Sequence, residues 1–132
     1  MPELDDARYI LLTTFKRDGT RVSSPVWITG SAGTYTFTTG DRAWKTRRLL
    51  HNPAVEVQAC GVRGRIKPGA TLYRGNGEVR TTTDAVRTAE TALSAKYGWQ
   101  FRATKVADRL SSRFRRGDPQ RVVAIRLLLS ET

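Results

Sequence analysis

The sequence has very little of the chemistry on which metal sites, disulfides and nucleophile triads depend. Cys60 is the only cysteine and His51 the only histidine among 132 residues. One cysteine excludes a disulfide framework, and one histidine makes a zinc site or a Ser-His-Asp triad a poor prediction. The motifs GxSxG, GxxxxGK[ST] and HExxH are absent, as is a GxGxxG after a strand. If the protein is an enzyme, we expect a cofactor to supply the reactive atom.

Long apolar runs are missing as well. No stretch approaches about eighteen consecutive apolar residues, and the opening MPELDDARYI lacks the basic-then-apolar order of a signal peptide. We therefore expect a soluble, cytoplasmic protein without a membrane span. A length of 132 residues, 39% of them hydrophobic, predicts one domain over residues 1–132.

Positive charge is the strongest feature of the composition. There are 23 lysines and arginines against 12 acidic residues, which makes the net charge +11. The cations cluster at residues 42–48, 63–67 and 109–121. Such clusters suit nucleic acid, an acidic membrane surface or a polyanionic small molecule, and a solvated arginine-rich surface is the plainer alternative. Charge alone does not choose among them.

The pattern of apolar and β-branched residues predicts a mainly β protein with added helices. Asp18-Gly19 and residues 30–33 are expected turns, and Gly75-Asn76-Gly77 is interpreted as a bulge or bend. We expect a small, six- to seven-stranded antiparallel β-barrel. Predicted strands cover residues 8–16, 21–29, 34–40, 54–60, 71–83 and 121–129, and predicted helices cover about 42–52, 84–97 and 104–114, with Asp41 and Asp84 as N-caps and Gly98 past the end of the second.

The stretch from Gly40 to Pro53 joins a threonine-rich strand to a basic helix. Lys45 and Arg48 are three residues apart and therefore lie on one face of the predicted helix. Together with the hydroxyls of Thr38 and Thr39 and the free amides of the first turn, they suit a phosphate. The alternative is a helix with solvated basic residues. Trp44 either shields this site or fills the core, and helical spacing favours the core.

A second candidate site is Ser24-Pro25-Val26-Trp27. Pro25 cannot donate to a strand ladder, so it marks an edge, a bulge or a strand end whose free peptide groups can bond a planar heterocycle. Trp27 can offer a flat contact to such a ring. The alternative is an ordinary edge strand with one interior aromatic. Tyr97-Gly98-Trp99 can close over a ligand or pack against the barrel.

Five segments carry a resemblance to a known family: GTRVSSPVWI, TYTFTT, AWKTRRLLHNPAVEV, GRIKPGA and KYGW. In this succession the chain resembles the pyridoxamine 5'-phosphate oxidase-like proteins, which are split-barrel flavin and deazaflavin oxidoreductases. The branch that it resembles uses coenzyme F420. The similarity runs from Ala7 to Leu129, and its most specific parts are Pro25-Val26-Trp27 and Lys45-x-x-Arg48-Leu49 with Asn52-Pro53.

The resemblance implies an FMN-binding split barrel that forms a homodimer, with two cofactor sites at the subunit interface. By the same resemblance, Lys45 and Arg48 bind the cofactor phosphate with Thr38 and Thr39, with Trp44 beside them. Ser24, Pro25, Val26 and Trp27 then line the tricyclic ring. The longer set of substrate-phosphate residues found in the pyridoxamine-phosphate oxidases proper has no match in this chain, and no catalytic residue is assigned.

FMN and the deazaflavin F420 share a ring and a ribityl phosphate, so the Lys45 region suits both. F420 continues into a chain of glutamates, and the loop cations Arg63, Arg65 and Lys67 suit such a tail. We therefore expect an F420-dependent reductase that passes a hydride to an activated double bond of a small organic substrate. A proton comes from solvent or from a tyrosine such as Tyr97. The alternatives are an FMN-binding relative, a non-catalytic cofactor carrier, and a nucleic-acid-binding barrel, for which the uncharged TYTFTT strand is unfavourable.

Overall fold

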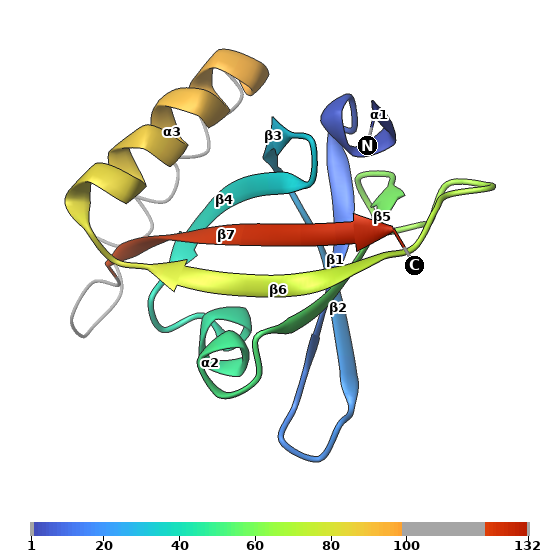
Figure 1. Ribbon diagram of the computed structural model, residues 1–132, viewed down its shortest axis with the longest axis horizontal. Helices are drawn as coiled ribbons and strands as arrows, with labels where there is room; N and C mark the ends of the chain where they lie inside the picture. Colours follow the sequence, from blue (N-terminus) through green and yellow to red (C-terminus); the bar gives the residue numbers. More distant parts are fainter. Residues whose placement is uncertain (1, 99–120, 132) are drawn as a thin grey trace.

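One antiparallel sheet of seven strands runs through the part of the chain that the computed structural model describes, residues 2–98 and 121–131. The strand order is β2-β1-β5-β6-β7-β4-β3, so β2 and β3 are the two edges. Figure 1 shows the sheet curled, with α3 over one side of it and α2 at another. The strands are β1 (Tyr9–Phe15), β2 (Arg21–Val26), β3 (Thr29–Ser31), β4 (Thr34–Gly40), β5 (Ala54–Cys60), β6 (Tyr73–Arg80) and β7 (Val122–Glu131), and the helices are α1 (Pro2–Asp5), α2 (Trp44–His51) and α3 (Thr83–Tyr97). The predicted antiparallel split barrel is confirmed.

The core lies on the inner face of the curled sheet. Alternation along β1 and β4 buries Ile10, Leu12, Tyr35 and Phe37, as the period-two pattern predicts. The interior strand β7 adds Ile125 and Leu127, both fully buried. The threonines of β4 that precede and follow these aromatics face the other way, which leaves a polar outer face.

The predicted single strand over residues 21–29 is wrong, because the chain breaks at Trp27 and Ile28. β2 ends at Val26 and β3 begins at Thr29, and the two short strands lie at opposite edges of the sheet. The end of α3 binds the backbone at this break. Ile28 N donates to the Tyr97 hydroxyl over 3.1 Å, and Lys96 Nζ donates to Ile28 O over 2.8 Å. These bonds satisfy peptide groups that leave the strand ladder.

The bulge predicted at Gly75-Asn76-Gly77 is also wrong. β6 pairs with β7 without an extra residue from Tyr73 to Arg80. The glycines instead allow close approach, since a Cβ on Gly75 would lie 1.8 Å from Leu128 O and one on Gly77 would lie 3.0 Å from Leu49 Cδ2. In the hairpin between β3 and β4, Ala32 and Gly33 have φ of 53° and 90°, the left-handed values that a two-residue turn requires.

Both predicted N-caps are misplaced by two residues. The N-cap of α2 is Ala43, without a side-chain cap, while Asp41 Oδ1 accepts from Arg121 N over 3.1 Å and so ties the strand end to β7. The N-cap of α3 is Thr82, whose hydroxyl accepts from Ala85 N over 3.2 Å. Gly98 closes α3 with φ 61°, as predicted.

The predicted helix at 104–114 lies outside the described residues. Within residues 2–98 and 121–131, no helix is both long and apolar enough to cross a membrane.

Candidate functional site

Helix α2 is held on the barrel by one buried stripe, which leaves Arg48 directed toward β1. Leu49 packs against Gly77 of β6, and Thr46 is buried with its hydroxyl donating to Gly40 O over 2.8 Å. Arg48 lies on the neighbouring side of the helix, where its Nε donates to Thr14 Oγ1 over 2.7 Å. Arg48 is thereby fixed in place, while no described residue bonds its two terminal nitrogens.

Lys45 is a half-buried cation next to another cation. Burial lowers the pKa of its ammonium, and the neighbouring Arg48 guanidinium lowers it further. Among the described residues, no carboxylate or carbonyl accepts a hydrogen bond from Lys45 Nζ. Two close positive charges without a counter-ion are unfavourable in a partly desolvated place, and a bound anion would relieve the cost. The structure thus brings Lys45 and Arg48 together as the sequence predicted.

The first turn of α2 adds to the attraction for an anion. Since Ala43 provides no side-chain cap, the helix begins with amide groups that no side chain within residues 2–98 and 121–131 satisfies. The two threonines before it do not act together, because Thr38 and Thr39 alternate across β4. Thr39 shares the core face of Phe37, whereas Thr38 shares the outer face. At most one of these two hydroxyls can join Lys45 and Arg48 on a single side of the sheet.

The second predicted segment lies on an edge strand, as Pro25 indicated. Among the described strands β2 has a neighbour on one side only, so its other side leaves backbone groups without a strand partner in that part of the chain. The register with β1 puts Ser24 and Val26 on the core side, opposite Leu12 and Ile10. Pro25 faces outward. The residues Ser24, Pro25 and Val26 therefore do not present one common face, although their peptide groups share the free edge.

Trp27 is half-buried and packs against the end of α3. Its ring stacks on Tyr97 with centroids 4.7 Å apart and planes 10° from parallel, and Tyr9 meets it edge-on at 6.3 Å. One face of the indole is thus already covered. The Tyr97 hydroxyl lies 2.8 Å from Arg8 O and 2.9 Å from Ile28 O, and burial raises the pKa of Tyr97 to about 12. Tyr97 is therefore poorly suited to donate a proton to a substrate.

Trp44 is 70% exposed, so the interpretation as a core residue is wrong. It follows the N-cap on the outer side of α2, where Arg47 lies over its ring at 5.2 Å. Helical spacing could not distinguish this position from a core one, because α2 has only eight residues and a single buried stripe. Trp44 is adjacent to Lys45 in the chain and remains available to an external group.

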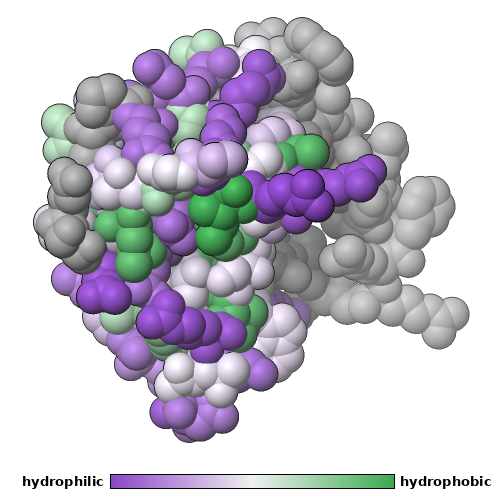
Figure 2. All heavy atoms as spheres, turned by 90° about the vertical axis from the view of Figure 1, so that its right-hand side faces the viewer, coloured by the Kyte–Doolittle hydropathy of each residue, from purple (hydrophilic) through white to green (hydrophobic). Residues whose placement is uncertain are grey.

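The cations Arg63, Arg65 and Lys67 are exposed on the loop after β5. This loop projects from the molecule on the side away from α3 (Figure 1), and that side is largely hydrophilic, with apolar side chains scattered singly (Figure 2). The loop reaches β2, since a Cβ on Gly64 would lie 3.7 Å from Pro25 Cδ. It does not reach α2, because β5 separates them by about 20 Å of extended chain.

The two predicted groups of cations, the pair on α2 and the loop after β5, consequently lie near different points of the edge strand β2. Val22 of β2 pairs with Thr14, which holds Arg48, and Pro25 lies under the basic loop. Three residues of strand, or about 10 Å, separate these two points. The cationic pair and the basic loop are therefore two separate positive regions at the two ends of β2.

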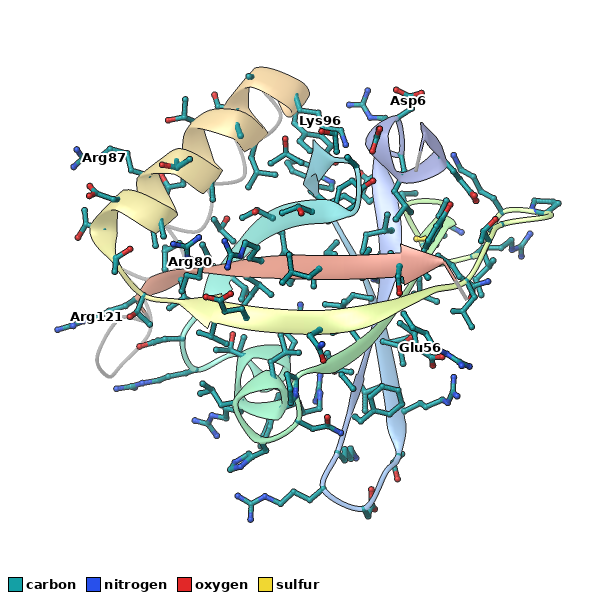
Figure 3. All side chains as sticks on the ribbon, in the orientation of Figure 1. Asp6, Glu56, Arg80, Arg87, Lys96 and Arg121 are labelled. Carbon is teal, nitrogen blue, oxygen red and sulfur yellow. The ribbon has the colours of Figure 1, made fainter. Side chains whose placement is uncertain are left out.

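Sequence patterns did not single out three residues that hold this part of the structure in place: Thr14, Glu56 and Lys96. Thr14 carries a hydroxyl on the otherwise apolar face of β1, and that irregularity in the alternation was the available signal. Glu56, labelled in Figure 3, is only 4% exposed. It is bridged by Arg21 and by Arg74, whose Nε lies 2.9 Å from Glu56 Oε2. Lys96 binds two carbonyl groups, which no local pattern indicates. Among the residues that the structure describes, no group of three His, Cys, Asp or Glu side chains is placed to hold a metal ion.

Comparison with known families gives one match. Residues 2–126 match the family described as pyridoxamine 5'-phosphate oxidase. No curated protein matches the chain.

Several solved structures share the fold at low identity. One is described as an F420 reductase, with 18% identity, a TM-score of 0.60, and 98% of this chain and 91% of that chain covered. A pyridoxamine 5'-phosphate oxidase-related, FMN binding protein from Nostoc punctiforme has 15% identity, a TM-score of 0.57 and coverage of 91% and 69%. The General Stress Protein 26 from Bacillus anthracis has 18% identity, a TM-score of 0.57 and coverage of 97% and 84%. Similarity at this level concerns the fold.

Proposed function

The chain belongs to the pyridoxamine 5'-phosphate oxidase family, and from that premise we propose that it is an F420-dependent oxidoreductase. The observation that carries the proposal is the cationic pair of Lys45 and Arg48. Both lie on α2, Lys45 in its first turn and Arg48 in its last, without a counter-ion among the described residues. A phosphate that the two cations share would supply the missing negative charge.

The residues present fit a flavin-like cofactor in three respects. Lys45 and Arg48 would hold the phosphate, with Thr39 or Thr38 supplying one further hydroxyl. The free edge of β2 at Ser24, Pro25 and Val26 would bind polar atoms of the ring. When bound, the cofactor supplies the hydride, and the protein contributes orientation and exclusion of water. Because the Tyr97 hydroxyl is bound to backbone, solvent is the proposed source of any proton.

We choose F420 over FMN as the proposed cofactor because of the positive charge of the chain. The chain has a net charge of +11, and a cofactor with a polyglutamate tail gives that charge a binding partner. Similarity to a protein described as an F420 reductase supports the same choice. The basic loop lies next to Pro25, at the end of β2 where the ring would bind. The phosphate would bind at Lys45 and Arg48, toward the other end of β2, so the tail that follows it would extend away from the loop of the same subunit. Arg63, Arg65 and Lys67 would therefore meet the tail of a cofactor bound mainly by the partner subunit.

This placement requires the homodimer, which we propose as the active form. Its cofactor sites would lie where α2 and β2 of one subunit meet the partner. Leu128 and Val122 on the outer face of the interior strand β7 are each 45% exposed, and they would offer apolar surface to a partner. Light scattering on the purified protein should give twice the chain mass of 14.8 kDa. A monomer at micromolar concentration would contradict the shared site.

The cofactor itself is tested by titrating the purified protein with F420 and, separately, with FMN while following fluorescence. We expect F420 to bind more tightly than FMN, with an affinity that falls as salt rises because the tail contacts are electrostatic. Tighter binding of FMN would overturn the choice of cofactor. Mixing the protein with reduced F420 and a small enone then tests catalysis. Binding without any oxidation of reduced F420 by a panel of activated alkenes would indicate a carrier.

A further inference from the structure

A hollow lies between α3 and the outer face of the sheet. It has a volume of about 550 Å³, within the range of small-molecule sites. Its walls come from α3, from β3 and β4, and from the paired ends of β6 and β7. Neither α2 nor the segment Ser24–Trp27 lines it, so it is separate from the proposed cofactor site. Thr36, Arg80, Thr88, Ala89, Ala92 and Ala124 are among its lining residues.

The hollow exists because the side chains that α3 directs toward the sheet are large at its C-terminal end and small along the rest. Leu93 and Tyr97 pack against Trp27 at the C-terminal end of the helix. Toward the N-terminal end, the residues of the helix that face the sheet are alanines, and the sheet residues opposite them include Ala124 and Gly30. Small side chains on both sides leave space that a packed interior would fill.

Arg80 places a positive charge in the wall of the hollow. It is the last residue of β6 and half-buried, and no described residue forms a hydrogen bond or ion pair with it. Figure 3 shows Arg80 between α3 and the sheet, whereas Arg87 of α3 points away from the molecule. A guanidinium that loses solvent without gaining an acceptor is costly, and an anion in the hollow would supply one.

The remaining walls define the kind of anion. Thr36 and Thr88 provide hydroxyls, and Ala89, Ala92 and Ala124 provide an apolar surface. Asp84 also lines the hollow and is exposed, so its negative charge disfavours ligands with several charges. We propose that this hollow binds a small organic monocarboxylate, with the carboxylate on Arg80 and the apolar body against the alanines of α3.

The test uses benzoate as the probe, with the full chain labelled with ¹⁵N and no cofactor added. Titration should shift the amide signals of Thr36, Thr88 and Ala124 in a saturable manner. Arg80→Met should weaken binding at least tenfold. The matched control is Arg87→Met, which removes the same charge from the exposed side of α3 and should leave the benzoate affinity unchanged. The spectrum of each variant also reports whether it is folded.

Three results would overturn the proposal. These are the absence of shifts at millimolar benzoate, equal weakening by both variants, and shifts centred on Lys45 and Arg48. Inorganic phosphate serves as the competing probe, and binding of phosphate at the hollow more tightly than benzoate would contradict the assigned class of ligand. Because F420 is absent throughout, these results do not depend on the function proposed for α2.

Discussion

Two lysines beside aromatic residues occupy comparable places in this molecule and differ in their surroundings. Lys45 follows Trp44 at the start of α2, and Lys96 precedes Tyr97 at the end of α3. Burial lowers the pKa of both ammonium groups. Lys96 Nζ donates to Ala7 O over 2.9 Å and to Ile28 O over 2.8 Å, and Asp5 and Asp6 favour its charged form. The charged neighbour of Lys45 is the cation Arg48.

The aromatic residues next to the two lysines differ in their exposure to solvent. Tyr97 is 5% exposed and stacks on Trp27, whereas Trp44 is 70% exposed. The end of α3 is therefore complete within the chain, because its polar atoms and its ring all have partners there. Helix α2 leaves a cation pair and an indole that an external group can use. A half-buried lysine marks a candidate binding site when the chain provides no acceptor for it.

The largest expected effect is on cofactor binding at α2. The double variant Lys45→Ala/Arg48→Ala should lose about 3 kcal/mol of binding free energy, or about a hundredfold in affinity, because two charge-assisted contacts to a phosphate disappear. Fluorescence titration with F420 measures the loss. Arg47→Ala, an exposed arginine on the same helix, is the control and should change the affinity less than about threefold. Equal effects would mean that α2 is only a basic surface.

The second effect is on stability at α3. Lys96→Met should lower the free energy of unfolding by about 1–3 kcal/mol, since the carbonyls of Ala7 and Ile28 lose a charged donor at the break between β2 and β3. Urea unfolding followed by circular dichroism measures it. The affinity for F420 should stay at the wild-type value. A variant that keeps its stability and loses the cofactor would reverse the comparison between the two lysines.

The third effect is on the pH dependence of binding. Because the pKa of Lys45 lies below its ordinary value of 10.5, the ammonium loses its charge earlier than a free lysine as pH rises. The affinity for F420 should therefore fall severalfold on the approach to pH 10.5. Over the same rise the contribution of Lys45 to the stability of the cofactor-free protein should increase, since a lysine in the unfolded chain keeps its proton to higher pH. In Lys45→Arg, which stays charged, the fall in affinity should disappear, and its persistence would assign it to another group.

The smallest effect is on the stability of the cofactor-free protein. Lys45→Met removes a partly desolvated charge beside Arg48 and leaves no described acceptor without a donor. The free energy of unfolding should stay within about 0.5 kcal/mol of the wild-type value or rise. Thermal unfolding in parallel with Lys96→Met gives the contrast. A loss as large as that of Lys96→Met would show that Lys45 has a structural partner.

Local patterns were sufficient for much of this protein. Period-two alternation predicted the burial of Tyr35 and Phe37, and the 3.6-residue period predicted α3 nearly to its ends. The spacing of Lys45 and Arg48 placed them on one side of a helix, as the structure has them. These features depend on residues within a few positions of one another, so a single sequence contains the information for them.

Tertiary structure alone decided the rest. The break at Trp27 and Ile28 depends on Tyr97 and Lys96, about seventy residues further along the chain. The same holds for Thr14, which meets Arg48 only because α2 folds back on β1. Whether a lysine is satisfied is a property of its neighbours in space. The sequence by itself determined which residues are cations and which strands they flank, and the packing of distant segments determined which of those cations remained without an acceptor.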